Sequence, residues 1–368
     1  MIAVSLAGCD QGNSGVSVFA AALLPRLIRD LRARGVETFV LGTDVERAAA
    51  GLADAPGPRL PPLLDRPALS AAFVLALVAP IARAHGARVL YLPCANRRIV
   101  AVGGVRVAGT VHDLAQLHVA NKYGPVRQVY IEHLLVPLLR RLSVVTAVSQ
   151  ATADDVVKLA HVPAARVRVI RNGVSLGAPA SATAPAGRPY LLYPARLEHP
   201  GKNHVRLLEG FARARVRGTH DLVFSGAEWG AGDRIRETIA SLGLGDRVRL
   251  AGFVDRDAFT SLLVGADAVV AAGLLEGFGL PAAEALACGK VVAASSTGSL
   301  PEVVGDLGAL FDPLDVDAIA AALDRAAYDE PLRARCASRG PTRAAQFSWD
   351  AAATATGNAL CEVLHAAA

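Results

Sequence analysis

The sequence predicts an α/β protein built from two units of similar design. Short apolar runs that suit buried strands alternate with longer amphipathic segments that suit helices, which is typical of sheets covered by helices on both faces. The alternation stops at residues 175–188, a stretch rich in alanine, proline and serine, and then begins again. The length of 368 residues suits two domains, and a hydrophobic content of 52% is enough for two cores.

The first unit is expected to open with a strand over residues 2–8, a glycine-rich loop over residues 9–16 and a long helix over residues 17–34. These elements open many nucleotide-binding α/β units, although G-x-x-G lacks the dinucleotide spacing and a tight turn is an equally good interpretation. The later expected strands are 36–42, 88–93, 105–111, 144–149 and 167–170, and the expected helices are 68–85, 123–141 and one capped by Ser149 or Thr152.

Polar side chains follow two of these strands. Asn96 and Arg97 come after the third expected strand, and His112 directly follows the fourth. Because ligands of open α/β sheets bind beyond the carboxyl ends of the strands, these side chains are candidates for a binding site. The alternative for His112 is a satisfied structural histidine. Asp113 suits an orienting or capping role better than that of a base.

The second unit repeats the alternation. Its expected strands are 190–193, 222–226, 248–250, 266–272 and 291–294, and its expected helices are 204–216, 233–242, 256–265, 281–287, 318–327 and a last one that ends at residue 364. Asp315 and Asp317 form a D-x-D pattern known from metal sites. A helix cap at Asp315 is the better interpretation, because negative charge near a helix N-terminus is favourable.

The stretch from Gly273 to Gly289 organises the second unit. Glycines on both sides of Phe278 let the backbone turn sharply and approach a ligand, and Pro281 suits the first turn of a helix. Backbone N–H groups at that helix start favour an anion, and Glu276 and Glu284 lie on either side of it. Carboxylates that flank a phosphate site suit a nucleotide-sugar; a glycine–proline turn with two solvated glutamates is the alternative.

The motif E-G-F-G-L-P-x-x-E-A-x-A-C-G at residues 276–289 resembles the signature of the retaining family-four glycosyltransferases of GT-B fold. The resemblance implies two Rossmann-like domains that face each other across a cleft. Residues 1–175 would form the acceptor domain and residues 187–346 the nucleotide-sugar donor domain. Residues 347–368, which begin with F-S-W, would pack back onto the first domain.

The resemblance also implies the roles of individual residues. Arg196 and Lys202, the latter within G-K-N, would bind the donor diphosphate in place of a divalent cation; composition alone would favour a solvated basic loop. No metal site and no cofactor besides the donor are therefore expected. The implied catalytic residues are Glu276, His112, Arg196 and Lys202, and the implied donor-binding residues are Gly15, Val254, Gly277, Phe278, Gly279, Leu280 and Glu284.

The implied activity is the transfer, with retention, of a hexose from a nucleoside-diphosphate sugar to a glycan, a lipid-linked acceptor or a small molecule, as in bacterial polysaccharide or glycoconjugate biosynthesis. L-P-E-V-V-G-D at residues 300–306 is similar to sequences of mannosyl- and rhamnosyltransferases and favours a GDP-mannose-like donor. Two alternatives stay open. One is a nucleotide-sugar epimerase of the same fold, and the other is a non-catalytic sugar-binding protein.

Composition narrows the partners and the location. Five cysteines spaced singly along the sequence indicate reduced thiols and a cytoplasmic protein, and the first residues read as a strand rather than a signal peptide. A net charge of +5 is too weak to imply nucleic acid but suits an anionic ligand or membrane surface. Weak attachment to an anionic membrane is expected through five arginines that solvated helix faces would explain equally well: Arg97, Arg98, Arg127, Arg140 and Arg141.

Overall fold

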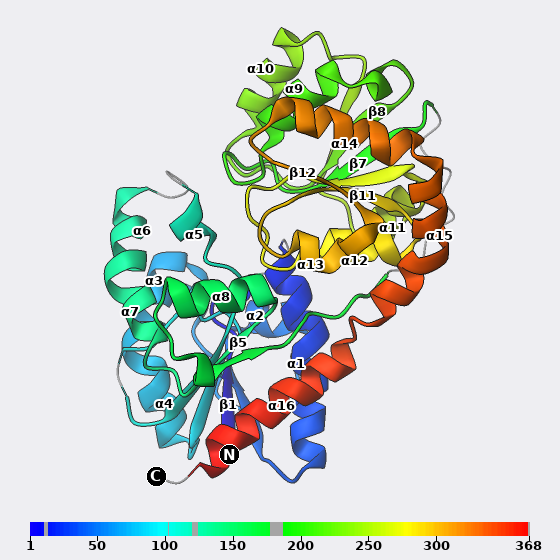
Figure 1. Cartoon of the computed structure of the whole chain (residues 1–368). Coiled ribbons are helices and arrows are strands. Elements are labelled where there is room, and N and C mark those ends of the chain that lie inside the picture. The colour runs from blue at the N-terminus through cyan, green and yellow to red at the C-terminus, as the bar shows by residue number, and fades with distance from the viewer. Residues whose placement is uncertain (11–13, 102, 120–123, 177–186, 367–368) are drawn as a thin grey trace. The chain divides into compact units, whose positions relative to one another are not determined.

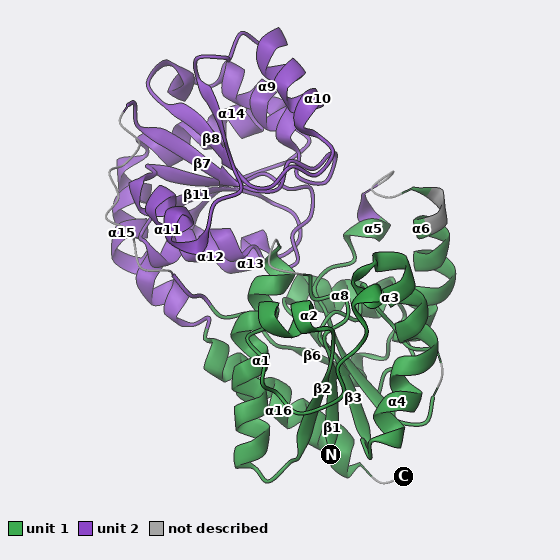
Figure 2. Cartoon of the chain, turned by 180° about the vertical axis from the view of Figure 1, so that it is seen from behind, with its two compact units in different colours: residues 1–117, 123–173, 348–368 green, residues 118–122, 174–347 purple. Residues whose placement is uncertain are grey.

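The computed structural model describes residues 1–10, 14–101, 103–119, 124–176 and 187–366. The chain forms two compact units (Figure 2). The first comprises Met1–Leu117, Tyr123–Gly173 and Ser348–Ala368, and the second comprises His118–Lys122 and Val174–Phe347. The predicted linker falls for the most part outside the described residues. That the two domains face each other across a cleft stays a prediction.

The first unit is built on a six-stranded parallel sheet with the strand order β2-β1-β3-β4-β5-β6. The order of the strands changes direction between β1 and β3. These two strands are neighbours in the sheet, and Ile2 of β1 pairs with Val89 of β3. The strands are β1 (Ile2–Ser5), β2 (Thr38–Leu41), β3 (Val89–Leu92), β4 (Arg106–Val111), β5 (Val144–Ala147) and β6 (Val167–Val169). The first five are buried almost throughout, as expected for a parallel sheet covered on both faces.

Helices cover this sheet on both faces (Figure 1). They are α1 (Gly15–Ala33), α2 (Asp44–Ala49), α3 (Pro67–Phe73), α4 (Ala79–Ala84), α5 (Ala115–His118), α6 (Pro125–Tyr130), α7 (Val136–Leu139), α8 (Gln150–Lys158) and the C-terminal α16 (Trp349–His365). α16 runs along α1, where the rings of Trp349 and Phe19 meet at 6.0 Å (Figure 1). The last helix therefore belongs to the first unit, although the whole second unit precedes it in the sequence.

The second unit has its own six-stranded parallel sheet with the order β12-β11-β10-β7-β8-β9. The strands are β7 (Tyr190–Pro194), β8 (Asp221–Ser225), β9 (Val248–Gly252), β10 (Ala268–Ala271), β11 (Val291–Ser295) and β12 (Gly308–Phe311). Counted within the unit, this is the 3-2-1-4-5-6 order of a doubly wound fold, and its direction changes between β7 and β10. The predicted α/β class of both units is confirmed.

The helices of the second unit form two layers. α9 (His204–Arg213), α10 (Gly232–Ser241) and α14 (Val316–Tyr328) pack together on one face, and α12 (Leu280–Ala287), α13 (Leu300–Val304) and α15 (Glu330–Ala345) on the other (Figure 1). α11 (Arg256–Gly265) connects β9 to β10. Asp315 caps α14 by accepting from the N–H groups of Asp317 and Ala318, which supports the cap and not the metal interpretation.

Several elements differ from the prediction. Each of the helices expected at 68–85 and 123–141 contains a π-helical turn, at Val74–Val78 and at Ile131–Leu135. The short helix α2 was missed. It is stabilised by a reciprocal capping box between Thr43 and Glu46. The buried Arg47 stabilises it further by donating to three carbonyl groups, those of Gly42, Val40 and Ala55. α15 was also missed, because its arginines and two prolines disguise a face that packs on α12.

Within the described part of the chain, no single helix is both long and apolar enough to cross a membrane. Two helical segments that meet at an angle of 53°, Pro67–Ala76 and Val78–Ala84, are together long and apolar enough, but only their length and composition support a membrane span.

Candidate functional site

The candidate residues of the second unit gather where its strand order changes direction. Arg196 and Lys202 lie in the loop after β7, and Glu276 lies in the loop after β10. β7 and β10 are neighbours that run parallel, so the two loops leave the sheet at the same edge. In open α/β folds this position is where ligands bind.

An ion pair joins these two loops. The Lys202 ammonium donates to the Glu276 carboxylate, with 2.7 Å between Nζ and Oε1, and both side chains are about one-fifth exposed, at 23% and 22%. Burial alone would lower the pKa of Lys202, but the Glu276 charge, its hydrogen bond and Glu198 raise it above its ordinary value. Lys202 therefore carries a permanent positive charge at neutral pH.

Arg196 lies in the same loop but pairs with a different carboxylate. Its guanidinium pairs with Glu198 at 3.1 Å and stacks over the ring of Trp229, with 4.5 Å to the ring centroid. Trp229 itself is 56% exposed, in the loop between β8 and α10. This stacking orients the guanidinium while its charge stays accessible.

The start of α12 is shaped by glycine. Gly279 precedes the helix with a φ of +81°, and a Cβ there would come within 2.6 Å of the Leu300 side chain. The N–H groups of Ala282 and Ala283 donate to the Gly279 carbonyl group. These two N–H groups are therefore engaged within the helix and do not serve as donors to a ligand.

The loop before α12 is held by a neighbouring segment. Ser299 donates to the Glu276 carbonyl oxygen from both its N–H and its hydroxyl group, at 3.1 and 3.0 Å. Gly298 has a φ of +60°, and a Cβ there would lie 2.6 Å from the same oxygen. Gly277 and Phe278 are buried, and the Phe278 ring meets Phe347 edge to face at 5.3 Å. Hydrogen bonds from Ser299 and the contact between Phe278 and Phe347 thus hold the backbone of the motif in place.

Glu284 lies inside α12 and is almost completely buried, with 3% of its side chain exposed. Its Oε1 accepts from Arg256, the first residue of α11, at 2.7 Å. Burial raises the pKa of the Glu284 carboxyl to about 7, and the charge and hydrogen bond of Arg256 oppose that rise. Val254, one of the implied donor-binding residues, is half-buried two residues before Arg256, in the segment that connects β9 to α11.

The candidate residues of the first unit also lie near its change of strand order. Gly15 begins α1 after the loop that follows β1, and His112 follows β4. The His112 ring is buried, with Nε2 2.9 Å from the Pro93 carbonyl oxygen and the Phe19 ring edge-on at 4.5 Å. The structure does not place His112 and Gly15 in contact. Asp113 caps the next turn by accepting from the Ala115 N–H group, as expected.

Two cysteines meet beside His112. Cys9 follows β1 and Cys94 follows β3, and their buried sulfur atoms lie 3.3 Å apart as free thiols. Burial raises the pKa of Cys94, but hydrogen bonds with Cys9 and His112 outweigh it and lower the pKa below its ordinary value. The sequence indicated isolated cysteines, so this pairing is a correction supplied by the fold.

Family models cover nearly the whole chain. Residues 15–177 match the model described as Glycosyltransferase Family 4, and residues 178–343 match the model described as Glycosyl transferases group 1. The O-antigen chain mannosyltransferase B of Escherichia coli is 31% identical over 267 residues, which are 69% of this chain and 70% of that protein. The chain belongs to the family-four glycosyltransferases.

Further relatives of this glycosyltransferase agree with that assignment. The MMP α-(1→4)-mannosyltransferase of Mycolicibacterium hassiacum is 31% identical over 223 residues, 59% of this chain but only 53% of the relative. A crystal structure of HepE from Anabaena in complex with UDP and glucose has a TM-score of 0.71 and 20% identity, and covers 100% of this chain and 99% of its own. Structural likeness of this kind shows that the transferase has the GT-B fold.

Sequence reasoning missed two residues that contact the candidate residues of the second unit of this transferase. Arg256 and Trp229 contact predicted site residues, but they lie on α11 and on the loop after β8, and only tertiary structure brings them close. A helix-starting arginine that precedes the motif by 20 residues gives no sequence signal. The tryptophan in the A-E-W-G loop gives only a weak one, because single large apolar residues are common on protein surfaces.

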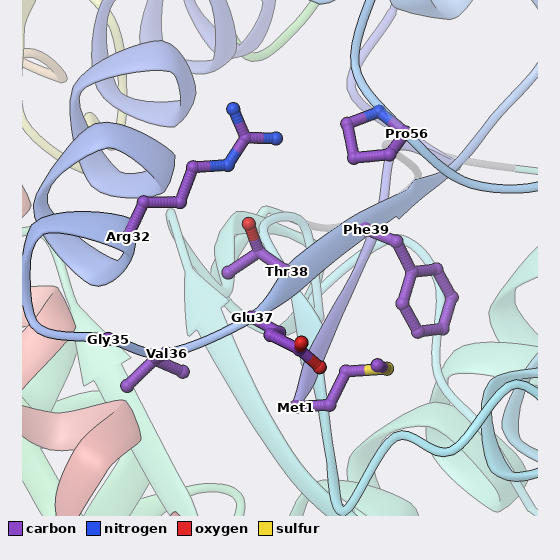
Figure 3. Close-up of a pocket in the computed structure, with 8 residues that line it drawn as sticks. All are labelled: Met1, Arg32, Gly35, Val36, Glu37, Thr38, Phe39 and Pro56. Carbon is purple, nitrogen blue, oxygen red and sulfur yellow. The ribbon is translucent and has the colours of Figure 1, made fainter.

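A shallow hollow of about 490 Å³ lies elsewhere on the first unit of the transferase (Figure 3). It opens at the amino ends of β1 and β2, whereas Cys94 and His112 follow the carboxyl ends of β3 and β4 in the same parallel sheet. We therefore assign it no part in the candidate site. It is lined by Met1, Arg32, Gly35, Val36, Glu37, Thr38, Phe39 and Pro56.

Proposed function

We propose that the chain is a retaining, metal-independent hexosyltransferase that uses a nucleoside-diphosphate sugar, with a GDP-mannose-like donor favoured. The acceptor is a glycan, a lipid-linked saccharide or a small molecule in bacterial polysaccharide or glycoconjugate biosynthesis. The observation that carries the proposal is the Lys202–Glu276 pair at the change of strand order of the second unit, beside the start of α12. Relatives named as mannosyltransferases support the choice of sugar.

The arrangement suits the departure of a nucleoside diphosphate. Lys202 and Arg196 would neutralise the diphosphate, and the N–H groups of Phe278 to Leu280 would bind its oxygens or the sugar. Glu276 would hold the sugar hydroxyls and Glu284 the ribose hydroxyls. His112 of the first unit would contact the donor sugar, and Gly15 would let the backbone approach the phosphates.

The proposed reaction needs no protein nucleophile. The bond between the anomeric carbon and the diphosphate oxygen breaks, and the oxygen leaves with the electron pair. The acceptor oxygen then bonds to the same face of the sugar, and its proton passes to an oxygen of the leaving phosphate. The residues of the chain contribute position and charge, which can supply most of the rate enhancement of such a transfer.

A panel of nucleotide-sugars tests the proposal. A donor that binds the folded protein raises its melting temperature by mass action, so GDP-mannose should stabilise it more than UDP-glucose or dTDP-rhamnose. HepE, of similar fold, was crystallised with UDP and glucose, which makes UDP-glucose the strongest competitor in the panel. Turnover of a nucleotide-sugar without any acceptor would favour an epimerase. Stabilisation by free sugars alone would favour a non-catalytic binding protein.

We expect transfer to continue in the presence of a chelator. Lys202 and Arg196 supply two positive charges where other transferases use a divalent cation. Initial rates with excess EDTA should equal rates without it within experimental error. Loss of activity on chelation, followed by recovery with magnesium or manganese, would contradict the proposal.

Attachment to anionic membranes stays a prediction, and the structure reduces the number of arginines that can carry it. Arg97, which pairs with Asp10, and Arg98, which donates to the Pro67 and Arg97 carbonyl groups, are only partly exposed. The other three, Arg127, Arg140 and Arg141, are exposed, and Arg140 also donates from Nε to the Ala160 carbonyl oxygen.

Three arginines near an anionic surface could contribute ~1 kcal/mol each. At low salt, more protein should therefore sediment with anionic than with neutral vesicles, and replacing Arg127 and Arg141 with glutamine should remove the difference. Equal sedimentation of the wild-type protein with both kinds of vesicle would rule the attachment out.

A further inference from the structure

Arg256 forms an ion pair with the buried carboxylate of Glu284. The bond between the terminal guanidinium nitrogen and Oε1 is 2.7 Å long, and the two residues lie 28 positions apart on different helices. Arg256 is about one-third exposed, at 36%, whereas Glu284 is exposed by only 3%. The guanidinium also lies over the Phe259 ring of its own helix, at 5.5 Å, which limits its motion.

A carboxylate buried to this extent needs a partner to stay ionised. Transfer of an unpaired charge out of water is costly, and the group takes up a proton instead. The other charged side chains on elements that pack against α12 are Glu302 on α13 and Glu330, Arg333, Arg335, Arg339 and Arg343 on α15, while β10 and β11 carry none. Arg256 is the charged residue whose charge and hydrogen bond oppose the effect of burial on the Glu284 pKa.

The bond also fixes the direction of the carboxylate. Arg256 engages Oε1, so the lone pairs of Oε2 remain for other donors. Two neighbouring hydroxyl groups, such as those of a ribose, are donors that a carboxylate with one occupied oxygen can still bind. Without the guanidinium, the side chain would lose both its charge and its orientation.

We infer that Arg256 is a positioning residue, which keeps Glu284 ionised and oriented to accept hydrogen bonds from the two ribose hydroxyls of the donor. The inference rests on the proposed function, because that proposal assigns the ribose to Glu284. Arg256 itself need not touch the nucleotide. It acts through the carboxylate, and its removal should therefore change how the protein responds to the ribose hydroxyls and to pH.

The test is calorimetric titration with GDP and with 2′,3′-dideoxy-GDP, with UDP and dideoxy-UDP run in parallel. The wild-type protein should bind the ribose form about ten- to a hundredfold more tightly than the dideoxy form. Arg256→Met should reduce that preference to within about threefold, and Arg256→Lys should restore part of it. Arg213→Met removes an exposed pair with Asp317 in the same unit and should leave the preference unchanged.

The pH dependence supplies a second readout. Protonation removes the charge of Glu284, so GDP affinity should fall as pH decreases from 8 to 6, around the pKa of about 7. In Arg256→Met the opposing charge is gone, so the midpoint of this fall should move to higher pH. A merely structural role of Arg256 would lower affinity equally at every pH and for both nucleotides.

The outcomes separate the two proposals. If the wild-type protein binds none of the four nucleotides, or does not distinguish ribose from dideoxyribose, the donor role of Glu284 is wrong. If the wild-type protein distinguishes them and a folded Arg256→Met variant does so equally well, with an unchanged pH midpoint, the inference about Arg256 alone is overturned. Melting temperatures without nucleotide establish that each variant is folded.

Discussion

Shortening the two glutamates of the α12 motif is expected to give two different kinetic defects. Glu284→Ala should raise the donor KM more than it lowers kcat, because the ribose lies far from the reacting bond and its contacts change little as that bond breaks. Glu276→Ala should mainly lower kcat, because the sugar ring gains positive charge as the diphosphate departs. A lost charge-assisted hydrogen bond costs about 1.5–3 kcal/mol, so each defect should be roughly ten- to a hundredfold.

Steady-state kinetics over a range of donor concentrations measures both effects. Glu276→Gln is the matched variant, since it keeps the size of the side chain but removes the charge that pairs with Lys202. Both glutamates border the start of α12, so the melting temperature of each variant must be compared without donor. Folded alanine variants with near wild-type kcat and donor KM would show that the site assignment is wrong.

Replacing Lys202 with methionine is expected to lower kcat by about a hundred- to a thousandfold. The ammonium lies at the change of strand order, 2.7 Å from Glu276, where a leaving diphosphate would develop negative charge. Removal of one preorganised group that stabilises such charge typically costs this factor. Methionine keeps the length and apolar character of the stem, so lost packing should contribute little.

Two variants accompany this experiment. Lys202→Arg keeps the charge and should retain more activity than Lys202→Met, though less than wild type, because the wider guanidinium does not fit the ammonium's position. Lys290→Met removes a half-buried lysine at the other end of α12 and should leave kcat within about twofold. Equal activity of Lys202→Met and Lys290→Met would remove Lys202 from the reaction.

The parts of the structure that sequence reasoning predicted well are those decided by neighbouring residues. The backbone around Phe278 turns because Gly279 adopts a φ of +81°, and α12 begins where the proline allows it. The Asp315 cap and a cap at Ser149 or Thr152 were predicted for the same local reason; the structure has Asp315 and Ser149 as caps. The apolar runs likewise became buried parallel strands, since a strand covered on both faces needs apolar residues throughout.

Helix interruptions were beyond this reasoning. The segments at 68–85 and 123–141 were each predicted as one continuous helix, yet each contains a π-helical turn. α15 contains Pro341 and many arginines, and it forms because one of its faces packs on α12. Propensity is a weak guide when tertiary packing stabilises a helix that its own sequence does not favour.

The sequence by itself determined the α/β class and the glycine-dependent start of α12, because these depend on short-range sterics, capping and burial; the residues that it proposes for a donor site stay a prediction. Only the tertiary structure decided which side chains from distant parts of the sequence meet. Lys202 and Glu276 lie 74 positions apart, Arg256 and Glu284 lie 28 apart, and the thiols of Cys9 and Cys94 lie 85 apart. Such pairs form because the strand order places particular loops at one edge of a sheet, and strand order depends on contacts between segments that no local pattern specifies.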